Sequence, residues 1–156
     1  MSRKVCIVTG SRAEYGLLYP ILKEIKRHDD LDMQLVATTM HLSDEFGLTY
    51  QQIEKDGFKI DKKINNLSKL DSNSSMAKSS GMATTLLADC FEKLSPDIVL
   101  LLGDRFETHA AATTALLMKI PIAHIHGGEV TQGAVDEQLR HAITKMSYLH
   151  FCSTDT

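Results

Sequence analysis

The chain has 156 residues, of which 43% are hydrophobic and 24% are charged, and its formal net charge is −3. This length and composition are typical of one globular domain, and the lack of a basic excess argues against nucleic acid or an anionic membrane surface as a partner. The cysteines are few and far apart, which argues against a zinc or redox motif and predicts three small buried residues in a reducing cytoplasm: Cys6, Cys90 and Cys152.

The first half of the chain predicts strands and helices in alternation. Val5 to Thr9 is a short apolar segment that ends at Gly10 and indicates a buried strand, too short for a signal peptide or a membrane span. Leucine and isoleucine then recur at helical spacing from Leu17 to Ile25. The next expected elements are a strand, a helix and an outer strand: Met33 to Met40, Phe46 to Lys55 and Phe58 to Ile64.

The second half begins with a polar stretch, Asn65 to Ser80, which is rich in serine and asparagine. We expect at least its start to be a loop, and a mobile lid over a cleft is one hypothesis for it. Apolar spacing predicts a helix from Met82 to Leu94, stopped by Pro96. A strand, a helix, a strand, a helix and a last strand follow: Ile98 to Leu102, Phe106 to Met118, Ile122 to Ile125, Val135 to Met146 and Leu149 to Cys152.

Strands that alternate with helices predict an α/β fold, a doubly wound parallel sheet of the Rossmann-like type. The sequence stops directly after the last predicted strand, so we expect residues 1–156 to be one domain of a larger protein. In such open sheets, ligands bind outside the carboxyl ends of the strands. The residues at each predicted strand end are therefore the candidates for a site.

The first strand end reads Gly10-Ser11-Arg12 and runs into a helix. A glycine turn at a helix N-terminus, with an arginine fork beside it, indicates a phosphate site. The alternative is a capping box between Ser11 and Glu14, and the two interpretations are compatible. No second glycine stands two places after Gly10, which argues against tightly bound NAD or FAD.

The IVLLL strand ends in Gly103-Asp104-Arg105-Phe106-Glu107. Asp104 lies at the mouth of a buried strand, where a carboxylate is well placed for acid–base work. The alternative is that Asp104 caps the next helix with Glu107 at its third position, and as a bare pattern the two are about even. Arg105 could pair with either acid or bind a phosphate.

The next strand end reads His124-Ile125-His126 and is followed by two glycines and Glu129. Strand alternation predicts that His124 and His126 share a face. His126 lies nearest the strand mouth, where it could titrate near neutral pH, and the alternative is a tight turn with an inert histidine. His41, after the second strand, is by itself more typical of a surface or turn residue than of a ligand.

Charged residues share one face of the helix that follows: Asp136, Glu137, Arg140 and His141. Their spacing predicts ion pairs along the helix, Asp136 with Arg140 and Glu137 with His141 or Arg140. In isolation this face is more typical of a solvated surface than of a site. The functional alternative is a carboxylate near a helix N-terminus, aimed at the same crevice. No spacing in the sequence is typical of a metal site.

Three segments, in this order and spacing, resemble the hydrolysing UDP-N-acetylglucosamine 2-epimerases, in particular their sialic-acid branch: TGSRAEYG, LLGDRFE and HIHGGEVTQGAVDEQLRHAITKMSYLHF. The resemblance covers Val5 to Cys152 and implies the first half of a GT-B-type fold, whose second domain is absent here. It implies a cytoplasmic enzyme, a homo-oligomer at full length, that needs no cofactor. It also implies that the C2 proton and UDP are lost from the UDP-sugar substrate and that water adds to the glucal, giving N-acetylmannosamine.

The resemblance also assigns roles to residues. The catalytic positions are Asp104, His126, Glu137 and Asp136, and the substrate-binding positions are Gly10, Arg12, His41, Arg105, Arg140 and His141. His126 stands where several relatives have a catalytic glutamate, so the same chemistry on UDP-diacetamidobacillosamine stays open, as does a GT-B glycosyltransferase. A phosphoacceptor regulatory domain is set aside, because the first strand is not followed by an acid cluster. The fragment alone is expected to have no useful turnover.

Overall fold

The computed structural model describes residues 2–66, 72–130 and 135–153. The strands in this part of the chain are β1 Arg3–Thr9, β2 Leu31–Thr38, β3 Lys62–Ile64, β4 Ile98–Leu102, β5 Ile122–Ile125 and β6 Leu149–Phe151. The helices are α1 Arg12–Arg27, α2 Tyr50–Lys55, α3 Asn73–Leu94, α4 Phe106–Leu117 and α5 Val135–Met146. Two short 3-10 segments, Thr39–Leu42 and Asp44–Phe46, follow β2.

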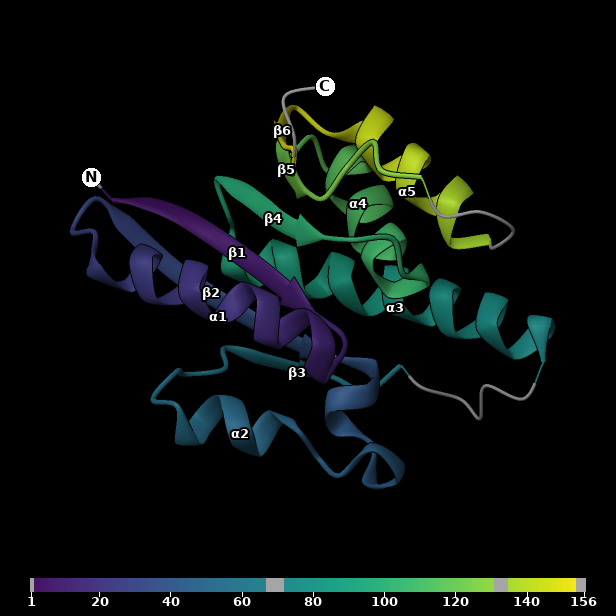
Figure 1. The fold of residues 1–156 in the computed structure, drawn as a ribbon, viewed down its shortest axis with the longest axis horizontal. Coiled ribbons are helices and arrows are strands. Elements are labelled where there is room, and N and C mark those ends of the chain that lie inside the picture. The colour runs from purple at the N-terminus through teal and green to yellow at the C-terminus, as the bar shows by residue number, and fades with distance from the viewer. Residues whose placement is uncertain (1, 67–71, 131–134, 154–156) are drawn as a thin grey trace.

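All the described strands join one sheet, in the order β3-β2-β1-β4-β5-β6, and every pair of neighbours is parallel (Figure 1). The chain runs outward from β1 to β3 and then returns to build β4, β5 and β6 on the other side of β1. The predicted doubly wound, Rossmann-like sheet is confirmed. Its switch point lies between β1 and β4, where ligands bind in sheets of this kind.

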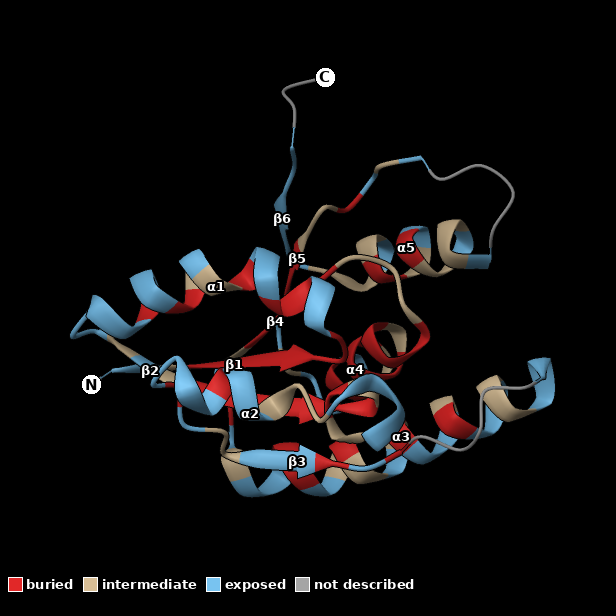
Figure 2. Cartoon of the chain, turned by 60° about the horizontal axis from the view of Figure 1, so that its bottom comes forward, coloured by how far each residue is buried: buried red, intermediate tan, exposed pale blue. Residues whose placement is uncertain are grey.

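Two apolar layers hold the helices onto the sheet. On one face, Cys6 and Val8 of β1 pack with buried residues of α3, α4 and α5, including Phe91 and Ile143. On the other face, Ile7 packs with residues of α1 and α2. Alternate side chains of β1 therefore serve opposite layers, as the twofold period of a strand requires. Figure 2 shows the middle strands buried, whereas the edge strands β3 and β6 carry exposed residues.

The described helices leave part of the second face open. An apolar hollow lies between α1 and the strands β4 to β6, lined by residues such as Ile25, Ile98, Ala123 and Phe151. Phe151 is 53% exposed beside it. None of the described helices is long and apolar enough to cross a membrane.

Helix α3 begins earlier than the sequence predicted. Ser72 caps it, and Ser75 completes a capping box by bonding back to the cap backbone. The helix that was predicted from Met82 therefore begins at Asn73, because Ser72 and Ser75 cap it and Asn73 and Ser74 are exposed helix residues. The lid hypothesis concerns a stretch of which residues 67–71 lie outside the described residues.

Three other boundaries differ from the prediction, two of them because of backbone conformation. Strand β2 ends at Thr38 because Thr39 has a left-handed φ of 54°. Helix α2 starts at Tyr50, not at Phe46, since Gly47 and Leu48 both have positive φ. The outer strand is shorter than predicted, because residues 58 to 61 do not pair with β2 as strand residues. Cys6 and Cys90 are buried as expected, but Cys152 is exposed.

Candidate active site

The turns that follow β1, β2, β4 and β5 meet at one edge of the sheet. The Met40 N–H donates to the Gly10 carbonyl at 3.1 Å, which joins the turns after β1 and β2. The Gly103 N–H donates to the Ile125 carbonyl, also at 3.1 Å, and joins β4 to β5. The sequence motifs at these strand ends therefore share the carboxyl rim, as a parallel sheet requires.

Four charged or titratable side chains form a chain of contacts at this rim. Arg140 of α5 donates from Nη2 to Oδ2 of Asp104, and from Nη1 to Oε2 of Glu129 at 2.9 Å. Oε1 of Glu129 lies 2.6 Å from Nδ1 of His126. Asp104 and His126, two of the residues predicted to be catalytic, are thus connected through Arg140 and Glu129.

Arg140 does not belong to a solvated helix face. Arg140 is only 8% exposed, and its side chain reaches from α5 to the turns after β4 and β5. A buried guanidinium needs such carboxylate partners, because an unpaired charge there would be costly. The solvated interpretation of the α5 charges is therefore wrong for Arg140. Of the predicted helix pairs, Glu137 with His141 is present at 3.7 Å.

Asp104 is not the cap of α4, so the alternative interpretation of the GDRFE motif is wrong. The capping position is Arg105, with no side-chain capping bond, and Glu107 is the second residue of the helix rather than the third. The Asp104 carboxylate is instead held by Arg140 at the strand mouth. This position, one-fifth exposed, leaves the carboxylate accessible from the rim.

His124 and His126 have separate environments. β5 ends at Ile125, and His126 has a left-handed φ of 59°, so strand alternation no longer applies to it. His124 is fully buried, with Nε2 2.7 Å from the Gly103 carbonyl and Nδ1 3.2 Å from Thr144 Oγ1. Burial lowers the pKa of His124. The prediction that the two imidazoles share a face is wrong, and His124 is a structural link between β4 and α5.

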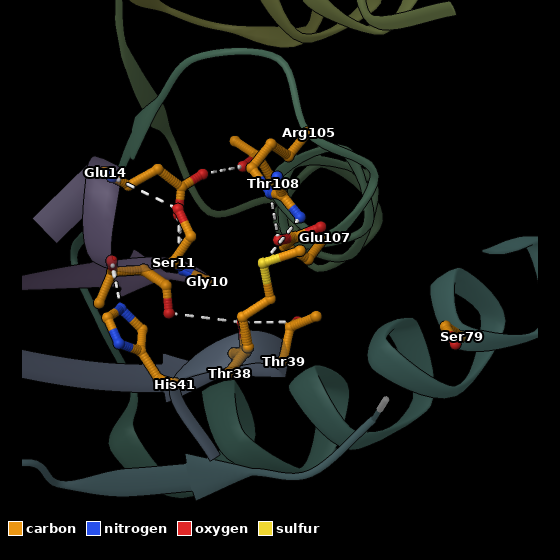
Figure 3. A network of polar contacts seen from close by, with 12 residues as sticks. Gly10, Ser11, Glu14, Thr38, Thr39, His41, Ser79, Arg105, Glu107 and Thr108 are labelled. Atoms are coloured by element: carbon orange, nitrogen blue, oxygen red, sulfur yellow. Dashed lines mark hydrogen bonds and ion pairs between the residues drawn. The ribbon is translucent and has the colours of Figure 1, made fainter. Parts of the chain in front are cut away.

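The capping box at the start of α1 is confirmed (Figure 3). Oε2 of Glu14 accepts from the N–H groups of Gly10 at 2.6 Å and Ser11 at 3.0 Å, and Ser11 Oγ accepts from the Glu14 N–H at 3.4 Å. The two N–H groups at the glycine turn are therefore directed at a carboxylate of the chain itself. Arg12, which follows them, is exposed.

A second buried acid, Glu107, lies against the same turn. It is 2% exposed, and Nε of Arg105 donates to its Oε1 at 2.6 Å. Its Oε2 is buried without a hydrogen-bond partner in the part of the chain that the structure describes. Burial alone would lower the pKa of Arg105. The carboxylates near it, Glu107 above all and also Asp136, outweigh burial, so the pKa lies above its usual value. The sequence analysis allowed Arg105 to pair with Glu107, and this pair is present. It missed the proximity of Glu107 to Glu14, because it considered Glu14 only as a cap of the first helix.

The pKa of Glu14 predicts a pH-dependent stability. Burial, and then the neighbouring Glu107, raise this pKa from 4.5 to about 7. The fold therefore disfavours the ionised carboxylate, and the resulting loss of stability starts above pH 4.5 and is complete above about pH 7. It amounts to at most about 3 kcal/mol. Glu14→Gln keeps an oxygen for the Gly10 and Ser11 N–H groups and removes the charge.

We expect Glu14→Gln to raise the melting temperature of the protein relative to wild type, more at pH 8 than at pH 5. Glu24→Gln is the matched control, because Glu24 lies on the same helix and is 62% exposed. The control should show no such pH-dependent difference. A Glu14→Gln effect that is constant from pH 5 to pH 8 would contradict the raised pKa.

His41 lies behind the rim. His41 is fully buried, and its Nε2 lies 3.1 Å from Thr9 Oγ1 and its Nδ1 2.7 Å from Thr49 Oγ1. Burial lowers its pKa to about 4, so the imidazole is neutral at pH 7. In this structure His41 connects β1 to the segment before α2, and it is not an exposed group at the rim.

Comparisons with known proteins agree with this fold. A family model described as UDP-N-acetylglucosamine 2-epimerase matches residues 23–156. The GDP/UDP-N,N'-diacetylbacillosamine 2-epimerase (hydrolyzing) of Campylobacter jejuni is 51% identical over 97% of this chain and 39% of its own length. The UDP-N,N'-diacetylbacillosamine 2-epimerase (hydrolyzing) of Legionella pneumophila is 44% identical, over 99% of this chain and 41% of its own length.

A solved structure of a UDP-GlcNAc 2-epimerase has a similar fold. The UDP-GlcNAc 2-epimerase from Neisseria meningitidis, bound to UDP-GlcNAc, has a TM-score of 0.85 and 27% identity. The match covers 97% of this chain and 40% of that one. The chain thus spans about two-fifths of the length of the relatives it matches.

Proposed function

Since the chain belongs to the UDP-N-acetylglucosamine 2-epimerase family, we propose that it is the N-terminal half of a hydrolysing 2-epimerase acting on a nucleotide-linked N,N'-diacetylbacillosamine. This choice of substrate is supported by the two diacetylbacillosamine 2-epimerases at 51% and 44% identity. This replaces UDP-N-acetylglucosamine as the first choice of sugar. In the complete enzyme we expect a cytoplasmic homo-oligomer with its cleft between two domains.

The observation that carries the proposed chemistry is the meeting of Asp104 and His126 at one rim, connected by Arg140 and Glu129. Inversion at C2 needs one group that takes the C2 proton on one face of the sugar and another that returns a proton on the opposite face. Two acid–base groups on different strand ends can lie on either side of a sugar that enters from the rim. Asp104 and His126 are the groups we propose for these steps.

The reaction is balanced without a redox partner. Removal of the C2 proton and cleavage of the C1–O bond release the nucleoside diphosphate and leave a C1=C2 double bond. Water then adds its oxygen to C1 and a proton to C2 from the other face, which gives the free sugar inverted at C2. Arg12 and Arg105 are the cations we propose for the diphosphate, and Asp136 and Glu137 for further contacts at the start of α5.

A second candidate keeps the chemistry and changes the sugar to UDP-N-acetylglucosamine. The observation in its favour is the solved Neisseria relative, whose structure holds UDP-GlcNAc in a closely similar fold. A site that hydrogen-bonds a second acetamido group should discriminate between the two sugars, because an unfilled buried polar site is costly.

The test uses the full-length enzyme with UDP- and GDP-linked N,N'-diacetylbacillosamine and with UDP-N-acetylglucosamine, in D2O and without an acceptor. We expect release of free C2-inverted sugar with deuterium at C2, and a kcat/KM at least ~100-fold higher for the diacetamido sugar. A higher kcat/KM for UDP-N-acetylglucosamine would favour the second candidate. Release of nucleotide only when an acceptor is added would instead indicate a glycosyltransferase.

A further inference from the structure

The turn after β5 holds His126 in an unusual backbone conformation. Its φ of 59° is rare for a residue other than glycine and costs about 1 kcal/mol or more. The His126 N–H donates to the Phe151 carbonyl at 3.0 Å, which ties the turn to β6. Such strain is maintained only where the surrounding contacts specify it.

The glycine that follows is packed too tightly for a side chain. A Cβ on Gly127 would lie 2.8 Å from both His124 Nδ1 and Thr144 Oγ1. The Gly128 N–H donates to the same Thr144 hydroxyl at 3.2 Å. The turn from His126 to Glu129 is therefore fixed against α5, and the position of Glu129 follows from it.

Both carboxylate oxygens of Glu129 contact residues of the rim. Oε1 lies 2.6 Å from Nδ1 of His126, and Oε2 accepts from Arg140 at 2.9 Å. The hydrogen bond from His126, and then one from Ser153, lower the pKa of Glu129, so it is ionised at neutral pH. An ionised carboxylate only accepts hydrogen bonds, so Nδ1 of His126 must carry a proton. The nitrogen left for proton exchange is Nε2.

We propose that Glu129 is a positioning residue, which orients the His126 ring and holds a proton on Nδ1, so that Nε2 works at the rim together with Asp104. This rests on the proposed function. The arrangement has the logic of a carboxylate that holds a catalytic imidazole in one tautomer. Arg140 completes it by holding Glu129 and Asp104 at a set separation. The competing explanation is that Glu129 only balances the charge of Arg140.

Two charged groups contact the residue His126. Oε1 of Glu129 lies 2.6 Å from Nδ1 of its ring, and Nη1 of Arg140 donates to its backbone carbonyl at 3.5 Å. Arg140 opposes a positive charge on His126, and Glu129 favours it.

The test compares Glu129→Gln, Glu129→Asp and Glu54→Gln in the full-length enzyme. Glu54 is the matched control, because its carboxylate forms a half-exposed ion pair with Lys63. We expect Glu129→Gln to lower kcat about tenfold to a hundredfold and to change KM little. Glu129→Asp should recover part of kcat, and Glu54→Gln should behave as wild type.

A double-mutant cycle separates the two explanations. In a His126→Gln background, Glu129→Gln should have almost no further effect on kcat, since its only route to catalysis is the imidazole. If the two losses multiply, or if Glu129→Gln alters KM alone, the positioning role is wrong and the charge-balancing role for Arg140 is favoured.

A readout without turnover makes the inference independent of the substrate. In ¹⁵N-labelled enzyme, His126 should be Nδ1-protonated in wild type, and Glu129→Gln should give a mixture of tautomers. Wild-type enzyme that is inactive on all three nucleotide sugars would refute the proposed function, and this measurement would still decide the role of Glu129. An unchanged tautomer in Glu129→Gln would overturn the inference.

Discussion

Asp104→Asn should lower the kcat of the full-length enzyme by about a thousandfold, with little change in KM. The asparagine keeps an oxygen that can accept from Arg140, so the turn after β4 should stay in place. It cannot take or return a proton at the C2 position of the sugar. A loss of this size, about 4 kcal/mol of transition-state stabilisation, is within the range of a general acid–base group.

The control for Asp104→Asn is Asp97→Asn. Asp97 lies at the opposite, amino end of the same strand, where its Oδ2 accepts from the Lys4 N–H at 2.8 Å. This variant should keep wild-type kcat, because it is remote from the rim. If Asp104→Asn also retains near-normal kcat, Asp104 acts only as the ion-pair partner of Arg140, and the proposed chemistry loses one of its two acid–base groups.

The overall topology could be predicted because apolar strands and amphipathic helices alternate along the chain. The buried IVLLL strand is the clearest case, with four of its five residues buried. Two boundaries that were missed, the end of β2 and the start of α2, involve left-handed backbone at Thr39 and Leu48. Residues other than glycine adopt this conformation because of tertiary contacts, which a single sequence does not reveal.

The sequence predicted where the candidate site lies, but it did not predict which side chains contact one another there. The motifs containing Asp104 and His126 were expected at one rim, and the structure places them there. The partners of Arg140 could not be predicted, because helix spacing favoured local acids such as Asp136 over Asp104, which lies 36 residues earlier in the chain. Burial reverses the preference: an arginine that is shielded from water pairs with whatever carboxylate the tertiary fold brings to it.

The turn after β1 gives the other large expected effect, which concerns stability. Gly10→Ala would place a Cβ 2.5 Å from Oε1 and 2.6 Å from Cγ of Glu107. Glu107 cannot move aside easily, because it is 2% exposed and bonded to Arg105 at 2.6 Å. We expect a loss of about 3 kcal/mol, within the usual range for overpacking or for breaking a buried charged pair, measured as a lower melting temperature of the full-length enzyme.

Gly16→Ala is the matched control for Gly10→Ala, because the substitution is the same and only the surroundings differ. Gly16 lies inside α1 with nothing within 4 Å of an added Cβ. Alanine there should raise stability by roughly 0.5–1 kcal/mol through helix propensity. Opposite signs for the two variants would mean that Gly10 is required for the close approach of Glu107, and not for the flexibility of the turn. Equal stabilisation by both would show that Glu107 does not pack on this turn, and the buried acid pair with Glu14 would then lose its geometric basis.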